Sequence, residues 1–500
     1  MTSPPKFLPS ACSSDVHSPL SGSESWSSLI ECPADFPEEL FDTAVSQLIH
    51  HPEYNSTLIL RSETICDSFD VSGFSPLIPT LDGFQKSRCI HRKILPRRPG
   101  RDASLEQYCT LYNGTSRPSH TVLILTPIFS EKDHLPYYHP RVAHLAFRYI
   151  QSHDTESGSA LLRIEAIPLP DTPLDQNSRL FRTSLALLET LHRYGWGAMT
   201  NYRKRVNHDV LVPREPYQDL YLVMRERHRG LVDTWQEVTD PLKHVFEDIG
   251  IATYLMLLWK TTFGNEEMET DMTTGEPWRK WPRPPAGFID IGCGNGLLTH
   301  ILTSEGYEGH GIDVRERTSW KFYPSDTQKH LHVHAFNPLD FDNKFFPPGV
   351  FVVANHADEL TPWAPVLSTL CSASGYLSIP CCAWDFDVRY ERSEKTMFPI
   401  PNHNPASNLE DFIKTLNLGG DGSNSSGYSM YRIWLATLSA HTGWEVECET
   451  LRIPSTRNWA IVGRGHLISK EESVKNVNEI VQKVKERSLF KPRKPEGKSH

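Results

Sequence analysis

The residues best suited to chemistry form one short string near the middle of the chain. Positions 288–296 read Phe-Ile-Asp-Ile-Gly-Cys-Gly-Asn-Gly, so a carboxylate, Asp290, precedes Gly292, Gly294 and Gly296. Glycine is needed where a backbone turns tightly between a strand and a helix and touches a ligand closely. A carboxylate suits a cation better than a pyrophosphate, and S-adenosylmethionine (SAM) carries a sulfonium and an ammonium. The string therefore predicts a SAM site.

The spacing of the glycines separates this site from a dinucleotide site. Dinucleotide enzymes use G-x-G-x-x-G/A, and here the third small position is Leu297. Asp313 stands 21 residues after Gly292, where a carboxylate can accept hydrogen bonds from both ribose hydroxyls. Because dinucleotide enzymes have an acid at the same spacing, Asp313 supports the fold without choosing the cofactor. A nicotinamide site and a glycine turn without a ligand remain the alternatives.

A second polar string, Asn-His-Ala-Asp-Glu at 355–359, directly follows a predicted strand. At the carboxyl edge of a parallel sheet, it would lie near the transferable methyl group. We expect Asp358 to accept a hydrogen bond or a proton from the acceptor, with His356 as the second candidate. Alternatively, Asp358 only caps the helix that begins near Pro362.

Positive charge is local, because the chain as a whole has a formal net charge of −10. Residues 86–101 contain seven basic residues and no acid. We predict phosphate contacts there and in the loop 452–458 between the last two strands. A solvated basic linker and an ordinary turn are the alternatives. The predicted phosphate-binding residues are Arg92, Lys93, Arg97, Arg98, Arg452 and Arg457.

Alternating strand-like and helix-like segments hold these residues. Strands separated by helices predict a parallel, doubly wound sheet, and two closing strands without room for a crossover helix predict an antiparallel hairpin. The fold class is α/β: a Rossmann-like, mostly parallel sheet of seven strands, similar to class I methyltransferases, plus an N-terminal elaboration. The strands are expected at 287–291, 309–314, 331–336, 350–355, 375–379, 444–451 and 459–462, and helices at 297–304, 362–371 and 431–441, with a further helix starting at 240.

Several strings together resemble one family, the cytosolic tRNA (uracil-2′-O-)-methyltransferases, which modify the ribose of uridine-44 in serine tRNA. The most specific is GYEGHGIDVRERTSW, and RKILPRRPGRD is similar to the family's N-terminal part. The resemblance implies SAM as cofactor, tRNA as partner and a 2′-hydroxyl as acceptor, with direct methyl transfer that requires no metal. The other strings, in order over 240–464, are DPLKHVFEDIGIATYL, FIDIGCGNGLLTHILTSE, ANHADELTPW, IPCCAWDFD and LRIPSTRNWAIVGR.

Four segments are expected along the chain. Residues 1–35 are rich in Ser and Pro, which predicts disorder. Residues 36–238 form an N-terminal domain and candidate tRNA-binding region, and residues 239–466 form the SAM-dependent methyltransferase domain. Residues 467–500 form an amphipathic helix and a basic tail.

Composition limits which other classes of protein this chain can belong to. No apolar run is long enough to span a membrane and no signal peptide is evident, which predicts a cytoplasmic protein with reduced thiols. Cys381 and Cys382 with Cys371 lack the spacing of metal ligands, so no metal is expected. Two other readings stay open: methylation of another RNA or a small molecule, and an inactive tRNA-binding subunit. The need for a partner protein is undetermined by the sequence.

Overall fold

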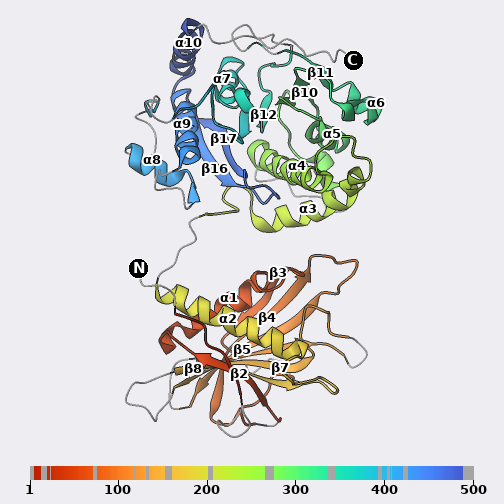
Figure 1. Cartoon of the computed structure of the whole chain (residues 1–500), viewed down its shortest axis with the longest axis vertical. Coiled ribbons are helices and arrows are strands. Elements are labelled where there is room, and N and C mark those ends of the chain that lie inside the picture. Colours follow the sequence, from red (N-terminus) through yellow and green to blue (C-terminus); the bar gives the residue numbers. More distant parts are fainter. Residues whose placement is uncertain are drawn as a thin grey trace. The chain divides into compact units, whose positions relative to one another are not determined.

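The computed structural model divides the chain into two compact units, Met1–Arg203 and Lys204–His500 (Figure 1). The boundary expected at residue 238 is corrected, because helix α3 (Arg214–His228) shares a buried core with helix α4 (Pro241–Phe263). The structure describes residues 5–12, 20–22, 24–70, 76–115, 120–130, 134–151, 160–200, 206–264, 275–335, 337, 344–391, 397–401, 406, 408–419 and 426–487.

The first unit is an antiparallel sheet covered by two helices, α1 (Phe41–His50) and α2 (Arg179–Met199). The strand order is β1-β2-β8-β7-β6-β5-β4-β3. Apolar side chains of both helices and of the strands that they cover, including β2, form one core. The strands are β1 Ser10–Ala11, β2 Ser27–Pro33, β3 Ile59–Ser68, β4 Phe84–Pro96, β5 Leu105–Gly114, β6 His120–Ile128, β7 Val142–Gln151 and β8 Ala160–Pro168.

Strand β2 corrects the expectation of disorder for residues 1–35. It pairs with β8, and Leu29, Ile30 and Cys32 are buried. The Ser/Pro-rich composition hid this strand because its pairing partner lies far along the chain. Within the same segment, residues 1–4, 13–19 and 23 lie outside the described part of the chain.

The second unit is a mixed α/β domain built on a sheet with the order β11-β10-β9-β12-β13-β17-β16. Strands β9 to β13 run parallel, and β17 runs antiparallel to both of its neighbours, β13 and β16. Two separate apolar cores flank this sheet. The strands are β9 Phe288–Ile291, β10 Gly309–Asp313, β11 Leu331–Val333, β12 Phe351–Asn355, β13 Gly375–Ile379, β16 Trp444–Thr450 and β17 Trp459–His466; a small hairpin pairs β14 Trp384–Asp385 with β15 Val388–Arg389.

Helices cover both faces of this sheet (Figure 1). One core takes side chains from α3, α4 and α5, and the other takes side chains from α7, α9 and α10. The amphipathic helix expected near the end is α10, which buries Val477 and Val484, and the basic tail 488–500 lies outside the described residues. The remaining helices are α5 Leu297–Ser304, α6 Ser325–Gln328, α7 Trp363–Leu370, α8 Leu409–Thr415, α9 Gly427–His441 and α10 Lys470–Glu486.

Helix α4 begins where its sequence directs. The Asp240 carboxylate accepts a hydrogen bond from the Leu242 amide at 3.0 Å, and Pro241 occupies the first helical position. From Glu247 to Trp259 every residue is buried. Two acidic residues of this helix, Glu247 and Asp248, therefore lie inside the domain. None of the helices in the described residues is long and apolar enough to cross a membrane.

Candidate active site

The three glycines form the turn between β9 and α5, and all of them have positive φ: 70° at Gly292, 54° at Gly294 and 75° at Gly296. A Cβ at Gly296 would meet the Leu331 methyl carbons at 2.9 Å, so only glycine fits. A Cβ at Gly294 would meet nothing within 4 Å. The backbone at Gly294 therefore borders open space, where a ligand can approach the main chain.

Asp313 joins the glycine turn to the end of β10. Its Oδ2 accepts a hydrogen bond from the Gly294 amide at 2.9 Å, and its Oδ1 accepts one from the Arg315 amide at 3.2 Å. A carboxylate offers about four lone-pair sites, so two remain for other donors. Asp313 thus lies where it can hold ribose hydroxyls beside the turn.

Asp290 is the most deeply buried acid of the site. It is 2% exposed, and its Oδ2 accepts a hydrogen bond from the Thr299 hydroxyl at 3.2 Å. Its Oδ1 is buried without a hydrogen-bond partner in the described residues. Burial raises the pKa of Asp290 to about 7; the charge of Asp313 adds to this rise and the Thr299 bond opposes it. A cation bound nearby would stabilise the ionised form.

A second buried acid, Asp248 of α4, lies in the same region. Burial raises its pKa well above the usual range, and the charges of Glu247 and Asp290 raise it further. The Asn355 side-chain amide donates to Asp248 Oδ1 at 3.2 Å and opposes this rise. Neither acid of α4 was predicted as a site residue, because the apolar face of this helix dominates its sequence pattern. The sequence feature that could have indicated them is the adjacent acidic pair, Glu247 and Asp248, within a largely apolar helix.

His356 lies at the carboxyl edge of β12 and is oriented by Glu247. Its Nε2 lies 3.1 Å from Glu247 Oε1, and its buried Nδ1 has no hydrogen-bond partner in the part of the chain that the structure describes. Burial alone would raise the pKa of Glu247, but its hydrogen bonds with His356 and Ser455 lower the pKa below the usual value. The Glu247 carboxylate favours the tautomer with the proton on Nε2, which leaves the Nδ1 lone pair without a partner in the described residues.

Asp358 has a different environment. It opens the short 3-10 helix Asp358–Leu360, and its Oδ1 accepts a hydrogen bond from Cys381 Sγ at 3.3 Å. No side chain caps α7, whose N-cap residue is Pro362. The alternative that Asp358 caps this helix thus has no hydrogen bond to support it, and a catalytic role for Asp358 stays a prediction.

The prediction of a phosphate contact at Arg92 is wrong. Residues 90–96 of β4 alternate between buried and half-exposed, and Arg92 falls on the buried face with 3% exposure. Its Nε donates to Gln107 Oε1 at 3.0 Å, and its Nη1 donates to the Leu48 and Ile49 carbonyls at the end of α1. It also lines a pocket of about 480 Å³. Arg92 therefore holds α1 onto the sheet.

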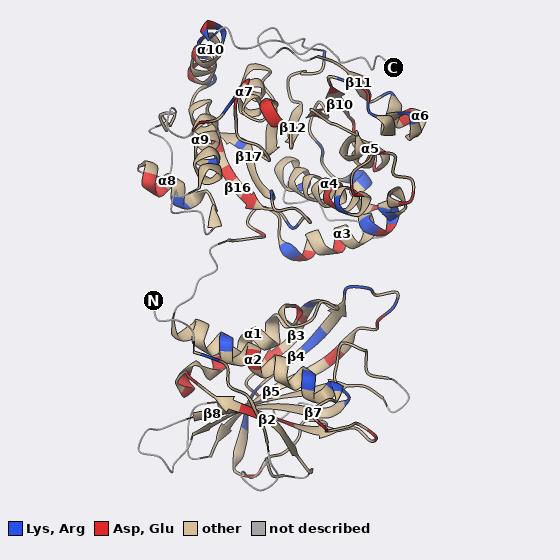
Figure 2. Ribbon diagram, viewed as in Figure 1, with Lys and Arg blue, Asp and Glu red and all other residues tan. Residues whose placement is uncertain are grey.

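Three other predicted cations remain accessible on β4 and the turn after it. Lys93 is half-exposed on the opposite face to Arg92, and Arg97 and Arg98 are exposed. Arg97 Nε donates to the Ile59 carbonyl at 3.0 Å, which orients its guanidinium without neutralising it. Lys93 itself lies between Glu63 of β3 and Glu106 of β5, which pair with it across the sheet, whereas no acid lies at 97–98. Helices α3 and α10 also carry charges of both signs (Figure 2). The basic surface at Lys93, Arg97 and Arg98, which we call the β4 patch, thus remains a candidate for phosphate contact.

The loop between β16 and β17 packs beside α4. Arg452 forms a bidentate pair with Asp209 at 2.6 and 2.5 Å, so its charge is balanced within the protein. Arg457 is exposed, and its guanidinium carbon lies 3.8 Å from the centre of the Tyr428 ring. Ser455 of the same loop bonds to Glu247. The loop therefore adjoins the His356–Glu247 pair, and Arg457 is its more available cation.

These features define the class of protein. A glycine turn with positive φ, an acid at the end of the next strand and a second, buried acid are the features expected of a SAM-dependent methyltransferase. Residues 211–338 match the family model "Predicted AdoMet-dependent methyltransferase". Residues 6–205 match the model "TRM44-like, N-terminal bet v1-like domain".

The relatives identify the family. A tRNA (uracil-O(2)-)-methyltransferase of Schizosaccharomyces pombe is 34% identical over 91% of this chain and 88% of the relative. Proteins of the same name in Neurospora crassa and Saccharomyces cerevisiae are 33% and 30% identical, covering 88% and 86% of this chain and 86% and 84% of their own lengths. The chain belongs to the tRNA (uracil-O(2)-)-methyltransferase family.

Proposed function

We propose that this chain transfers the methyl group of SAM to the ribose 2′-hydroxyl of a uridine in tRNA, with uridine-44 of serine tRNA as the target. The observation that carries the proposal is the glycine turn with its acids, in a chain that matches tRNA (uracil-O(2)-)-methyltransferases over most of its length. The sheet order β11-β10-β9-β12-β13-β17-β16 supports a class I methyltransferase architecture.

The residues that would hold SAM fit its charges. Asp313 would accept the ribose hydroxyls, and the open backbone at Gly294 would border the ligand. Asp290 and Asp248 would face the cationic part, because both are buried carboxyl groups whose raised pKa values a cation would lower. When bound, SAM supplies a methyl carbon attached to a positively charged sulfur.

The acceptor needs a group that takes the proton of the 2′-hydroxyl, which is a weak acid. We favour His356 over Asp358, which reverses the order expected from the sequence. Glu247 orients the His356 ring through Nε2 and would stabilise its protonated form. Nδ1 has no hydrogen-bond partner in the described residues but is buried, so the ring would have to turn before the 2′-hydroxyl could reach it. Asp358 is exposed and bonds to the neutral Cys381 thiol, whereas the partner of His356 is a carboxylate that would stabilise a proton on the ring.

Binding of SAM should release protons near pH 7. Asp290 has a pKa of about 7 in the free protein, and a bound cation lowers it. Affinity should therefore fall as the pH drops below about 7, approaching about tenfold per pH unit, and Asp248, whose pKa is also raised, adds to this pH dependence. Calorimetry in buffers of different ionisation enthalpy measures the protons released. Thr299→Val removes a bond that lowers this pKa and should move the midpoint upward; pH-independent affinity without proton release would contradict the assignment.

Binding of tRNA should weaken steeply with salt, because phosphate contacts release counterions. Replacing Lys93, Arg97 and Arg98 together by alanine should flatten the slope of log affinity against log salt by about 2 to 3 units. The control is the double variant Lys329→Ala/Lys414→Ala, which removes exposed lysines that bond to neighbouring aspartates. Filter binding at several salt concentrations measures both slopes.

This experiment also separates the rival readings. A small-molecule methyltransferase would bind tRNA weakly, with equal slopes in parent and variant. Equal slopes together with tight, salt-sensitive binding would reject the β4 patch and leave the tRNA substrate standing.

A further inference from the structure

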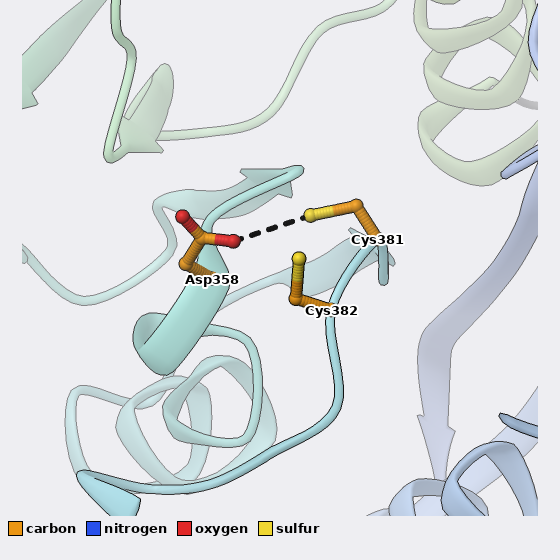
Figure 3. A group of neighbouring side chains, drawn as sticks. All are labelled: Asp358, Cys381 and Cys382. Atoms are coloured by element: carbon orange, nitrogen blue, oxygen red, sulfur yellow. Dashed lines mark hydrogen bonds between the residues drawn. The ribbon is translucent and has the colours of Figure 1, made fainter. Parts of the chain in front are cut away.

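Three potential metal ligands meet at the carboxyl edge of the second sheet. The side-chain ligand atoms of Asp358, Cys381 and Cys382 all lie within 4.8 Å of one another. Figure 3 shows the carboxylate and the two sulfur atoms gathered from two separate segments. Among the described residues this is the one group of three or more such side chains at this separation.

The sheet brings these residues together. Strands β12 and β13 are parallel neighbours, and Asn355 pairs with Ile379 at their carboxyl ends. Asp358 follows the first strand and the two cysteines follow the second, so both segments leave the same edge side by side. The Tyr428 hydroxyl donates to the Pro380 carbonyl at 2.6 Å, which fixes the start of the cysteine segment. Sequence spacing could not reveal this group, because its members belong to different strands.

The donor set matches one kind of ion. Thiolates and carboxylates together suit Zn²⁺, with bond lengths of about 2.3 Å to sulfur and about 2.0–2.2 Å to oxygen. In a tetrahedral site such ligand atoms lie about 3.5–3.8 Å apart. Cys381 Sγ lies 3.3 Å from Asp358 Oδ1, so only small side-chain movements are needed. Asp358 is exposed and both cysteines are half-buried, which leaves an entry path for an ion.

We propose that the chain binds a zinc ion through Asp358, Cys381 and Cys382. The ion replaces the protons of the two thiols and the hydrogen bond that now joins Cys381 to Asp358. Three protein ligands leave the fourth tetrahedral position to a water molecule or to an oxygen atom of a substrate. Its ligands are none of the residues proposed to hold SAM, but the two sites adjoin, because Ala357, next to Asp358, would lie 3.5 Å from a Cβ at Gly292. The proposal does not depend on the identity of the methyl acceptor.

Cobalt provides the spectroscopic probe, because Co²⁺ occupies such sites and its thiolate complexes absorb strongly. The full chain, freed of metal by a chelator, should bind one equivalent of Co²⁺ with a thiolate-to-cobalt absorption band, and Zn²⁺ should remove the band. Cys381→Ser and Cys382→Ser should each lower the band and weaken binding by at least tenfold. Asp358→Asn should keep the band but weaken binding. Cys66→Ser, which removes an exposed thiol of the other unit, should behave as the parent.

Alkylation gives a test that needs no variant. In the folded parent, Zn²⁺ should protect Cys381 and Cys382 from a thiol reagent and leave Cys66 unprotected, as mass spectrometry of the peptides would show. The absence of a thiolate band, an unchanged band in the Cys381→Ser/Cys382→Ser double variant, or equal labelling with and without Zn²⁺ would each overturn the proposal. Loss of the cooperative thermal transition in these variants would identify unfolding, and the protection result on the parent then decides.

Discussion

Replacing Gly294 by valine is expected to abolish SAM binding while the domain stays folded. A side chain at this position meets no protein atom within 4 Å, so it would fill the space that borders the glycine turn. The residue has a φ of 54°, which adds a strain of about 1–2 kcal/mol for a residue with a Cβ. Titration calorimetry with SAM measures the loss of binding, and thermal melting verifies the fold.

Gly83 offers a matched control for this variant. It has a φ of 77° and a Cβ there would also meet nothing within 4 Å, but it lies in the other unit. Gly83→Val should lose a similar amount of stability and keep the parental affinity for SAM. Parental affinity in Gly294→Val as well would show that SAM does not bind at this turn.

Asp313→Ala should weaken SAM binding by about 1.5–3 kcal/mol, because the ligand loses its hydrogen bonds to a charged group. Titration calorimetry measures this loss.

The second large effect is expected at the His356–Glu247 pair. His356→Ala should lower single-turnover methyl transfer by about 10²–10⁴-fold at saturating tRNA and SAM, because the 2′-hydroxyl loses its proton acceptor. Glu247→Gln should also lower the rate of methyl transfer, since the imidazole loses the carboxylate that orients it and stabilises its protonated form. SAM affinity should change little in His356→Ala, which separates this role from cofactor binding.

Asp358→Asn distinguishes the two candidate proton acceptors. If His356 takes the proton, Asp358→Asn should retain most of the parental single-turnover rate. A loss of about 10²–10⁴-fold in Asp358→Asn with a near-parental rate in His356→Ala would restore Asp358 as the acceptor. Near-parental rates in both variants would mean that catalysis relies on positioning alone.

The methyltransferase unit could be predicted closely because its signals are local. The signals are the glycines of the turn, the apolar runs of the buried strands and the glycine that ends α5. Each of them determines structure within a few residues of its own position. The glycine turn at 292–296 and Asp313 lie together as expected. The same is true of α4, whose start at Asp240 follows from its capping residues.

Features that depend on long-range pairing could not be read from the sequence. In the sequence, Arg92 is one of several cations in a basic run. In the structure it lies on the buried face of β4 and donates to carbonyls of α1. Glu247 contacts His356 only because α4 packs against the end of β12. Cys381 contacts Asp358 only because β13 ends beside β12. In each case the partner lies on another element, so no spacing rule along the chain could find it.

The position of the transferred methyl group in the tRNA decides whether the chain catalyses the proposed reaction. Serine tRNA that lacks this modification should be incubated with the chain and with SAM labelled in its methyl group, then digested with alkali. Because a 2′-O-methyl group blocks cleavage, the account predicts label in one alkali-resistant dinucleotide whose 5′ residue is uridine, at position 44. Label on a base or on another nucleoside, or no label with a SAM-binding protein, would contradict it.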